Sequence, residues 1–243
     1  MNTEFHIYEL SNGIRGIHRQ VKSGVARCAL FINAGSRDER KGEHGIAHFT
    51  EHGFFKGTEH RKAYQVNCRL ENLGGELNAF TTKEDTTIHA TVLRGDFAKA
   101  VELIADVAFH STFPDHELDK EREVILDEIN TYRDSPMDDI YDSFEDLIFA
   151  DSELGHNILG TPRDLKKIDS AAIHRFRART HTTDKMVFAS IGNISPKRIC
   201  EIAERYLGRY AATRQEFERV RPCEVAPFER VLNKHTHQAH CTC

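Results

Sequence analysis

The sequence has no apolar run that approaches the roughly 20 residues needed to cross a bilayer. Its first residues, Met1 to His6, carry neither the basic nor the apolar region of a signal peptide. There is no excess of basic residues, because 38 Asp and Glu stand against 33 Lys and Arg. This balance gives no electrostatic reason for binding nucleic acid or an anionic membrane. We therefore expect a cytoplasmic protein that binds neither nucleic acid nor a membrane.

The six cysteines lack C-x-x-C spacing, and nothing around them indicates a nucleophilic cysteine. In a reducing compartment we expect free thiols, three or four of them buried as small apolar side chains. The 243 residues suffice for one large domain or two small ones.

Hydrophobic periodicity predicts a mixture of hairpins and helices, which is typical of an α+β fold and not of a doubly wound parallel sheet. The predicted strands are 4–9, 14–21, 25–33, 76–82, 86–93 and 186–192. The predicted helices are 45–57, 62–73, 97–109, 114–133, 137–150, 170–180 and 196–208, with a loop at 155–162. We expect one domain over 1–212, a polar linker over 213–229, and the start of a truncated second domain over 230–243.

The predicted helix at 45–57 contains His48-Phe49-Thr50-Glu51-His52, an H-x-x-E-H motif. In a helix, His48 and His52 lie one turn apart on the same face, where two imidazoles can bind one metal ion. Glu51 lies close to that face. A bound metal acidifies a water molecule, and a nearby carboxylate takes its proton, as metal-assisted hydrolysis requires. The same residues are also compatible with a solvent-exposed amphipathic helix. The choice between this helix and a metal site depends on whether the chain supplies a third ligand.

Candidates for the third ligand lie in the predicted helix at 114–133. Glu121 and Glu128 are two turns apart and share a face, whereas Glu123 and Asp127 project elsewhere. A catalytic zinc takes three protein ligands and leaves one position to water. Acidic residues on a helix more often form a solvated face, so spacing alone leaves the choice open.

Two segments resemble the signatures of the pitrilysin-type (M16) zinc peptidases at the family's separation. They are Gly45–Thr58, which includes the H-x-x-E-H motif, and Glu121–Ile129. The resemblance is to the N-terminal catalytic domain of the short bacterial and mitochondrial type. It implies a mostly antiparallel sheet flanked by helices, and a zinc-dependent endopeptidase of peptides or small unfolded polypeptides.

The resemblance also implies roles for individual residues. His48, His52 and Glu128 would bind one Zn²⁺ per chain, Glu51 would be the catalytic base, and Glu121 would position the ligand helix or His52. Residues 74–81 resemble the family's strand that lines the cleft, so Asn78 and Ala79 would contact a peptide that pairs with this strand.

The chain departs from the family pattern at three positions. Thr50 and Gly53 stand where Leu and Met are common, and a glycine inside a helix costs about 1 kcal/mol relative to alanine. His89 stands where tyrosine is frequent, which puts substrate contacts along that strand in doubt.

The resemblance covers residues 1–240, the N-terminal half of a usual family member. A second M16-like domain or subunit is therefore an expected partner, beside peptide substrates. The alternative function is a weak or silent domain that needs the missing half, or a partner subunit, to form an active cleft. A further alternative is a separate metal cluster in the tail, formed by His235, His237, His240, Cys241 and Cys243. The remaining histidines lack ligand spacing, and we expect surface or partly buried positions for His6, His18, His60, His110, His116, His174 and His181.

Overall fold

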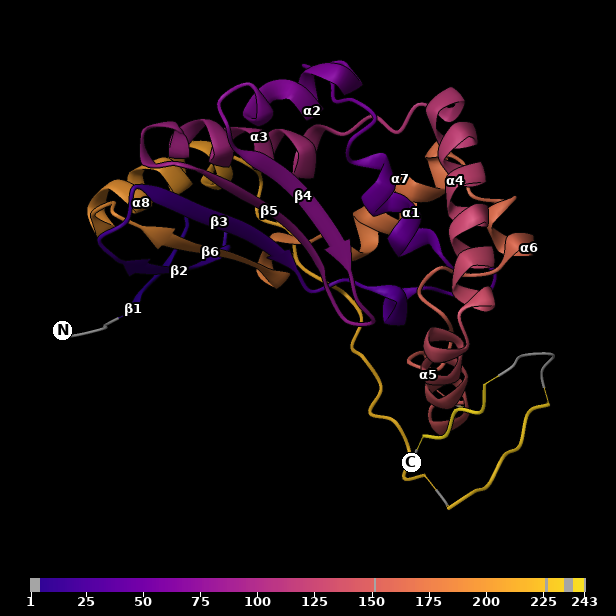
Figure 1. The fold of residues 1–243 in the computed structure, drawn as a ribbon. Helices are drawn as coiled ribbons and strands as arrows, with labels where there is room; N and C mark the ends of the chain where they lie inside the picture. The colour runs from indigo at the N-terminus through magenta and orange to yellow at the C-terminus, as the bar shows by residue number, and fades with distance from the viewer. Residues whose placement is uncertain (1–4, 151, 226, 234–237, 243) are drawn as a thin grey trace.

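The structure is a computed structural model that describes residues 5–150, 152–225, 227–233 and 238–242. One six-stranded sheet has helices packed on one face, and a second group of helices lies beyond one end of the strands (Figure 1). Within the described ranges, no helix is long and apolar enough to span a bilayer. The strands are β1 (Phe5–Glu9), β2 (Arg15–Gln20), β3 (Val25–Ile32), β4 (Glu76–Thr81), β5 (Thr86–Leu93) and β6 (Met186–Gly192).

The order of the strands across the sheet is β1-β2-β6-β3-β5-β4. The pair β2–β6 is parallel, and the other four pairs are antiparallel. This confirms the expected α+β fold with a mostly antiparallel sheet. The strand β6 enters between β2 and β3, which are consecutive in the sequence.

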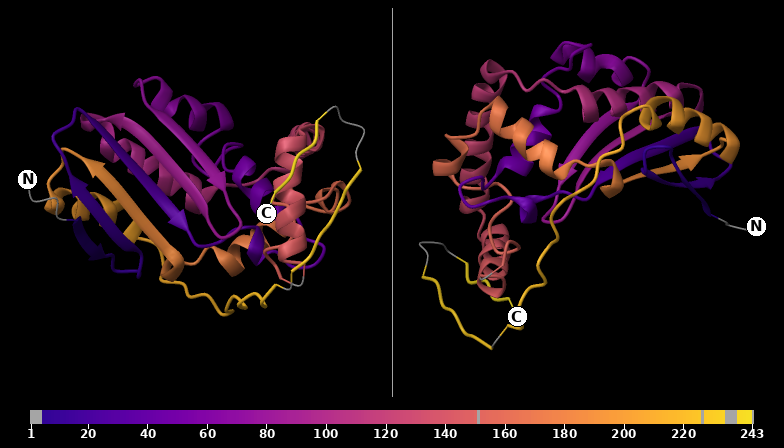
Figure 2. Two further views of the ribbon diagram at one scale, coloured as in Figure 1. Left: turned by 60° about the horizontal axis from the view of Figure 1, so that its bottom comes forward. Right: turned by 180° about the vertical axis from the view of Figure 1, so that it is seen from behind.

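The two faces of the sheet differ in burial, as the alternation in β3 shows. Cys28 and Leu30 are buried, whereas Val25 and Phe31 on the other face are exposed. The helix α3 (Phe97–His110) covers the buried face with α8 (Pro196–Ala203). No described helix lies over the opposite face, which is turned toward the viewer in the left panel of Figure 2.

The second group of helices surrounds the H-x-x-E-H segment. Its helix α1 packs against α4 and α7, and α5 continues from α4. The buried residues of α4 are Leu118, Ile125 and Ile129, whereas Val124 is 49% exposed. The helices of this group are α1 (Ile46–Gly53), α4 (Asp115–Asp134), α5 (Pro136–Ile148), α6 (Pro162–Leu165) and α7 (Ser170–Thr180). The helix α2 (Ala63–Glu71) packs instead against α3 and β4.

Several helix boundaries differ from the prediction. The motif helix is shorter than 45–57, because Gly45 has the left-handed conformation (φ 95°) and the helix ends at Gly53. Gly57 is also left-handed, but it forms a bridge with Lys62 instead of capping the helix. The predicted helix at 196–208 is α8 followed by a π-helical turn over Glu204–Gly208. The short helix α6 was not predicted.

The cysteine prediction was wrong in one respect. The described cysteines are free thiols, but only Cys28 among them is buried, while Cys68 and Cys200 are half-buried and Cys223 and Cys241 are exposed.

The described residues after the π-helical turn form no helix or strand. They are attached to the domain at several points, for example where the Arg219 Nη2 lies 2.7 Å from Asp38 Oδ2. The predicted linker and second-domain start therefore stay predictions. Of the tail histidines and cysteines, His240 and Cys241 are exposed. The remaining members, His235, His237 and Cys243, lie outside the described residues.

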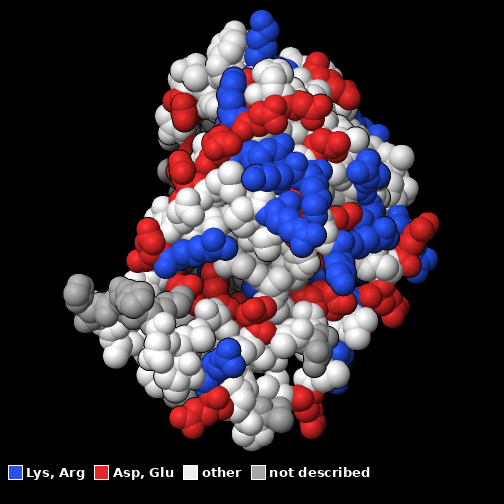
Figure 3. Space-filling view, turned by 90° about the vertical axis from the view of Figure 1, so that its right-hand side faces the viewer, with Lys and Arg blue, Asp and Glu red and all other residues white. Residues whose placement is uncertain are grey.

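The side of the molecule at the right of Figure 1 carries both signs of charge. Figure 3 shows a band of lysine and arginine side chains across this side, bordered above and below by aspartate and glutamate. The helices α4 and α6 lie on this side in Figure 1.

Candidate metal centre

The helices α1 and α4 bring three of the predicted site residues together. His48 and His52 lie one turn apart on α1, with ring centroids 4.6 Å apart. Glu128 on α4 faces both rings, with its Oε2 3.7 Å from His48 Nε2 and 3.8 Å from His52 Nε2. One ligand atom from each residue lies within 4.8 Å of the others. Two imidazoles and one carboxylate therefore converge on one point.

His48 is held in the neutral state that a metal ligand needs. Its side chain is 10% exposed, and burial together with the neighbouring His52 lowers the pKa of His48 to about 3. Its Nδ1 is buried and has no hydrogen-bond partner among the residues described. Only Nε2 faces the other two candidate ligands.

The imidazole of His52 is oriented by Glu121. The His52 Nδ1 lies 2.9 Å from Glu121 Oε2, and the other carboxylate oxygen lies 2.6 Å from Lys56 Nζ. Burial raises the pKa of Glu121, but hydrogen bonds from Lys56 and His52 outweigh it and leave the pKa below its usual value. An ionised Glu121 can only accept, so His52 Nδ1 donates, and the Nε2 is the ring nitrogen that faces Glu128.

Glu51 follows His48 by three residues on α1 and is partly buried. Burial raises the pKa of Glu51 to about 7, and the nearby Glu128 carboxylate acts in the same direction. A carboxylate with a pKa near 7 can both accept and release a proton at neutral pH.

The strand β4 lies beside α1 at the edge of the sheet and pairs only with β5 in the described sheet. Asn78 is exposed, whereas Ala79 is buried, and Asn78 Oδ1 accepts a hydrogen bond of 2.8 Å from the Ala79 N–H. His89 is the partner of Asn78 in β5 and is half-buried. The outer edge of β4 thus offers backbone groups close to the candidate metal centre.

The two departures within the motif are accommodated by packing. The Thr50 hydroxyl donates to the Ile46 carbonyl at 2.7 Å, which satisfies a side chain that is 1% exposed. At Gly53 a Cβ would lie 2.5 Å from Cδ1 of Phe113. The ring of Phe113 therefore takes the space that a larger side chain at position 53 would need.

The donor set fits a zinc ion. Zinc binds imidazole nitrogen and carboxylate oxygen, and three protein ligands are typical of its catalytic sites. His48 is neutral, and His52 has the second hydrogen bond that usually fixes a metal-binding imidazole.

The similarity of the sequence to known proteins assigns the chain to a family. A model of the family described as insulinase, peptidase family M16, matches residues 17–162. The chain belongs to peptidase family M16. An uncharacterized zinc protease of Bacillus subtilis, YmxG, is 35% identical to this M16 chain over 96% of the chain and 57% of the relative. The β subunit of the mitochondrial processing peptidase of Blastocladiella emersonii is 32% identical over 85% of the chain and 44% of the relative.

The fold of this M16 chain is also seen in solved structures. The crystal structure of a peptidase M16 inactive domain from Pseudomonas fluorescens has a TM-score of 0.84 at 17% identity, over 91% of this chain and 54% of the other. The chain spans about half the length of the curated relatives it matches.

Sequence reasoning missed two further groups of histidines in this M16 domain. Glu39, His44 and His156 form one, and Glu59, His60 and His110 form the other. We had expected His60 and His110 to be surface or partly buried residues without ligand spacing, and the structure places their ring centroids 4.6 Å apart. In each group two residues are close in the sequence but the third, His156 or His110, comes from a distant segment, so spacing along the chain does not indicate either group.

Proposed function

We propose that the chain is the zinc-binding half of a metalloendopeptidase that cleaves peptides or small unfolded polypeptides. The observation that supports this most is the convergence of His48 Nε2, His52 Nε2 and Glu128 Oε2 beside the carboxylate of Glu51. The name zinc protease carried by the Bacillus subtilis relative supports the choice of Zn²⁺. One ion per chain would occupy this centre.

In the proposed site, His48, His52 and Glu128 hold the ion, and the Glu121 carboxylate keeps the His52 ring in the binding orientation. Zn²⁺ supplies the Lewis acidity that lowers the pKa of a water molecule and polarises the scissile carbonyl. Glu51 accepts a proton from the attacking water and then gives it to the leaving amine. Without the ion, burial raises the pKa of Glu51 to about 7, so this carboxyl group can exchange a proton near neutral pH.

The outer edge of β4 is the proposed place for substrate. An extended peptide would add to this edge as a further strand, with hydrogen bonds to the backbone around Asn78 and Ala79. Such binding depends on main-chain groups, so it selects for an extended conformation more than for a particular sequence.

The alternative is a domain with little activity of its own that needs a second M16-like domain or subunit. Two observations favour it: the chain spans about half the length of its relatives, and one relative is named as a subunit. We propose that such a partner, from the rest of the polypeptide or from another subunit, closes the cleft over the zinc. The cytoplasm is the proposed location.

The test uses Glu128→Gln and Glu51→Gln beside the unchanged chain. Zinc content is measured by plasma mass spectrometry, and hydrolysis is followed with a quenched fluorescent peptide. Glu128→Gln should lower bound zinc and activity, whereas Glu51→Gln should keep the zinc and lose the activity. Equal zinc in Glu128→Gln and the unchanged chain would refute the site.

The same assay separates the two functions. If the chain alone hydrolyses the peptide, the dependence on a second half is wrong. If activity appears only after a C-terminal M16 half is added, and Glu51→Gln abolishes it, the alternative is correct.

A further inference from the structure

A buried carboxylate lies at the beginning of the metal-binding helix α1. The Glu39 side chain is fully buried. Its Oε1 accepts the Ala47 N–H at 2.9 Å, and its Oε2 accepts the Gly45 N–H at 2.9 Å. These bonds satisfy two amide groups at the N-terminus of a helix whose cap residue, Gly45, has no side chain.

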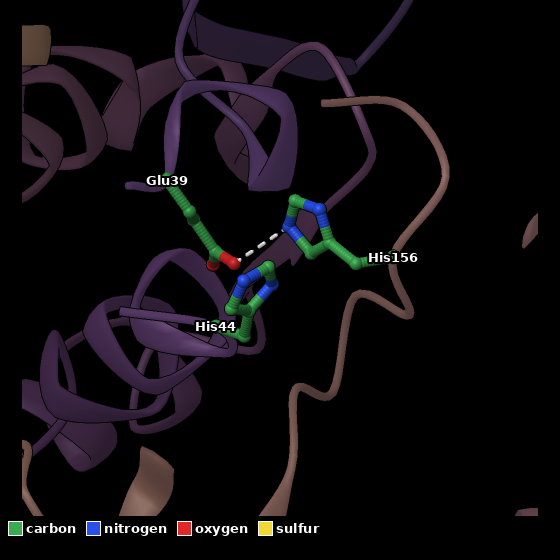
Figure 4. A group of neighbouring side chains, drawn as sticks. All are labelled: Glu39, His44 and His156. Carbon is green, nitrogen blue, oxygen red and sulfur yellow. Dashed lines mark hydrogen bonds and ion pairs between the residues drawn. The ribbon is translucent and has the colours of Figure 1, made fainter. Parts of the chain in front are cut away.

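Two histidines complete a cluster around this carboxylate. The His156 Nε2 lies 2.8 Å from Glu39 Oε2, and the ring of His44 lies edge-on to the ring of His156 with centroids 4.2 Å apart. Figure 4 shows the three side chains directed toward one another, Glu39 and His44 from the stretch that leads into α1 and His156 from a distant loop. One ligand atom of each lies within 4.8 Å of the others.

The position of His44 follows from the backbone. His44, His48 and His52 are spaced four residues apart, so a continuous helix would align all three on one face. Gly45 breaks the helix with its left-handed φ of 95°, and α1 begins only at Ile46. His44 is thereby separated from the row and joins Glu39 and His156 instead.

Packing holds this break in place. A Cβ on Gly45 would lie 2.7 Å from the Leu159 carbonyl oxygen, so the segment that follows His156 is pressed against the start of α1. No hydrogen bond from a described residue reaches the His44 ring, although one edge of it faces the other two groups. The cluster thus contains an imidazole with no hydrogen-bond partner among the described residues, beside a carboxylate and a second imidazole.

We propose that Glu39, His44 and His156 form a second zinc site, separate from the candidate metal centre. Two imidazoles and one carboxylate suit Zn²⁺, and the half-buried histidines give it access from solvent. The ion would replace the proton between His156 Nε2 and Glu39 Oε2. If the Zn–N and Zn–O bonds have their usual lengths and meet at a tetrahedral angle, the His156 Nε2 and the Glu39 Oε2, now 2.8 Å apart, need to separate by about 0.5 Å.

A zinc ion there would connect the 155–160 segment to the first turn of α1, one helical turn before His48. Since the ion binds only the folded arrangement, it would raise the thermal stability of the chain. This role does not require the candidate metal centre to be catalytic.

His44→Gln is the most informative variant, because it removes a proposed ligand without breaking any hydrogen bond described above. Zinc stoichiometry is measured by equilibrium dialysis and mass spectrometry on the full chain, with Cys241→Ser and Cys243→Ser throughout to remove the tail thiols. His116→Gln, at an exposed position on α4, is the matched control.

The expected stoichiometry is two ions for the background chain and for His116→Gln. It is one for His44→Gln, one for Glu128→Gln and none for the double variant. Zinc should also raise the melting temperature of Glu128→Gln but not that of Glu128→Gln with His44→Gln.

Equal zinc binding in His44→Gln and the background would overturn the second site. Equal binding in Glu128→Gln and the background would overturn the candidate metal centre instead, so the two failures are distinguishable. His156→Gln, as a second ligand variant, should give the same loss as His44→Gln if the second site is correct.

Discussion

Replacement of Glu121 tests whether the hydrogen bond to His52 controls zinc affinity. Glu121→Ala removes the acceptor 2.9 Å from His52 Nδ1 and leaves Lys56 without its partner at 2.6 Å. The imidazole is then free to rotate, and an uncompensated positive charge remains beside the site. Loss of such a supporting group typically weakens metal binding by about 10- to 100-fold, or about 1.4–2.7 kcal/mol.

Glu121→Gln should fall between Glu121→Ala and the unchanged chain, because its amide oxygen still accepts from His52 but carries no charge. Affinity is measured by competition with a chromophoric zinc chelator, in the His44→Gln background so that one site is observed. Glu123→Gln, exposed on the same helix, is the control and should bind zinc as the unchanged chain does. Unaltered affinity in Glu121→Ala would refute the reasoning.

Two further predictions concern stability. Gly53→Ala should lower the free energy of unfolding by about 1 kcal/mol in urea denaturation, because overpacking against Phe113 outweighs the gain in helix propensity. In a Phe113→Leu background, the smaller side chain leaves room for the Cβ, so Gly53→Ala should raise the free energy of unfolding instead. If Gly53→Ala stabilised the otherwise unchanged chain, the packing argument would be contradicted. Burial raises the pKa of Asp106, but hydrogen bonds from His60, Arg61 and Thr58 outweigh it and lower the pKa. Its stabilisation is therefore complete above the unfolded pKa, about 3.9, and is lost as pH falls through the lower folded pKa. Asp106→Asn should lower the free energy of unfolding by about 2 kcal/mol at neutral pH. It should also weaken the fall of this free energy as the pH is lowered. A pH dependence parallel to that of the unchanged chain would argue against this role.

Strong local patterns could be predicted from the sequence. The strand predicted over 25–33 and the helix predicted over 97–109 are present as β3 and α3, and each buries one face. The approach of Glu128 to His48 was implied by the family resemblance and not by spacing, since several acidic residues on α4 were equally available.

Long-range features could not be predicted. The start of α1 depends on the left-handed conformation of Gly45, where a Cβ would lie 2.7 Å from the Leu159 carbonyl oxygen of a distant segment. The contact between Glu39 and His156 spans 117 residues of sequence, and no local pattern indicates it. The domain boundaries and the cytoplasmic location stay predictions.

The insertion of β6 between β2 and β3 has a consequence for folding during synthesis. Until Met186–Gly192 has left the ribosome, β2 and β3 each present an unpaired edge in the middle of the future sheet. Unpaired edges are templates for aggregation, and pairing across so long a stretch of sequence is slow. We therefore expect the nascent chain to be prone to aggregation, and a substrate for chaperones, until β6 pairs with β2 and β3.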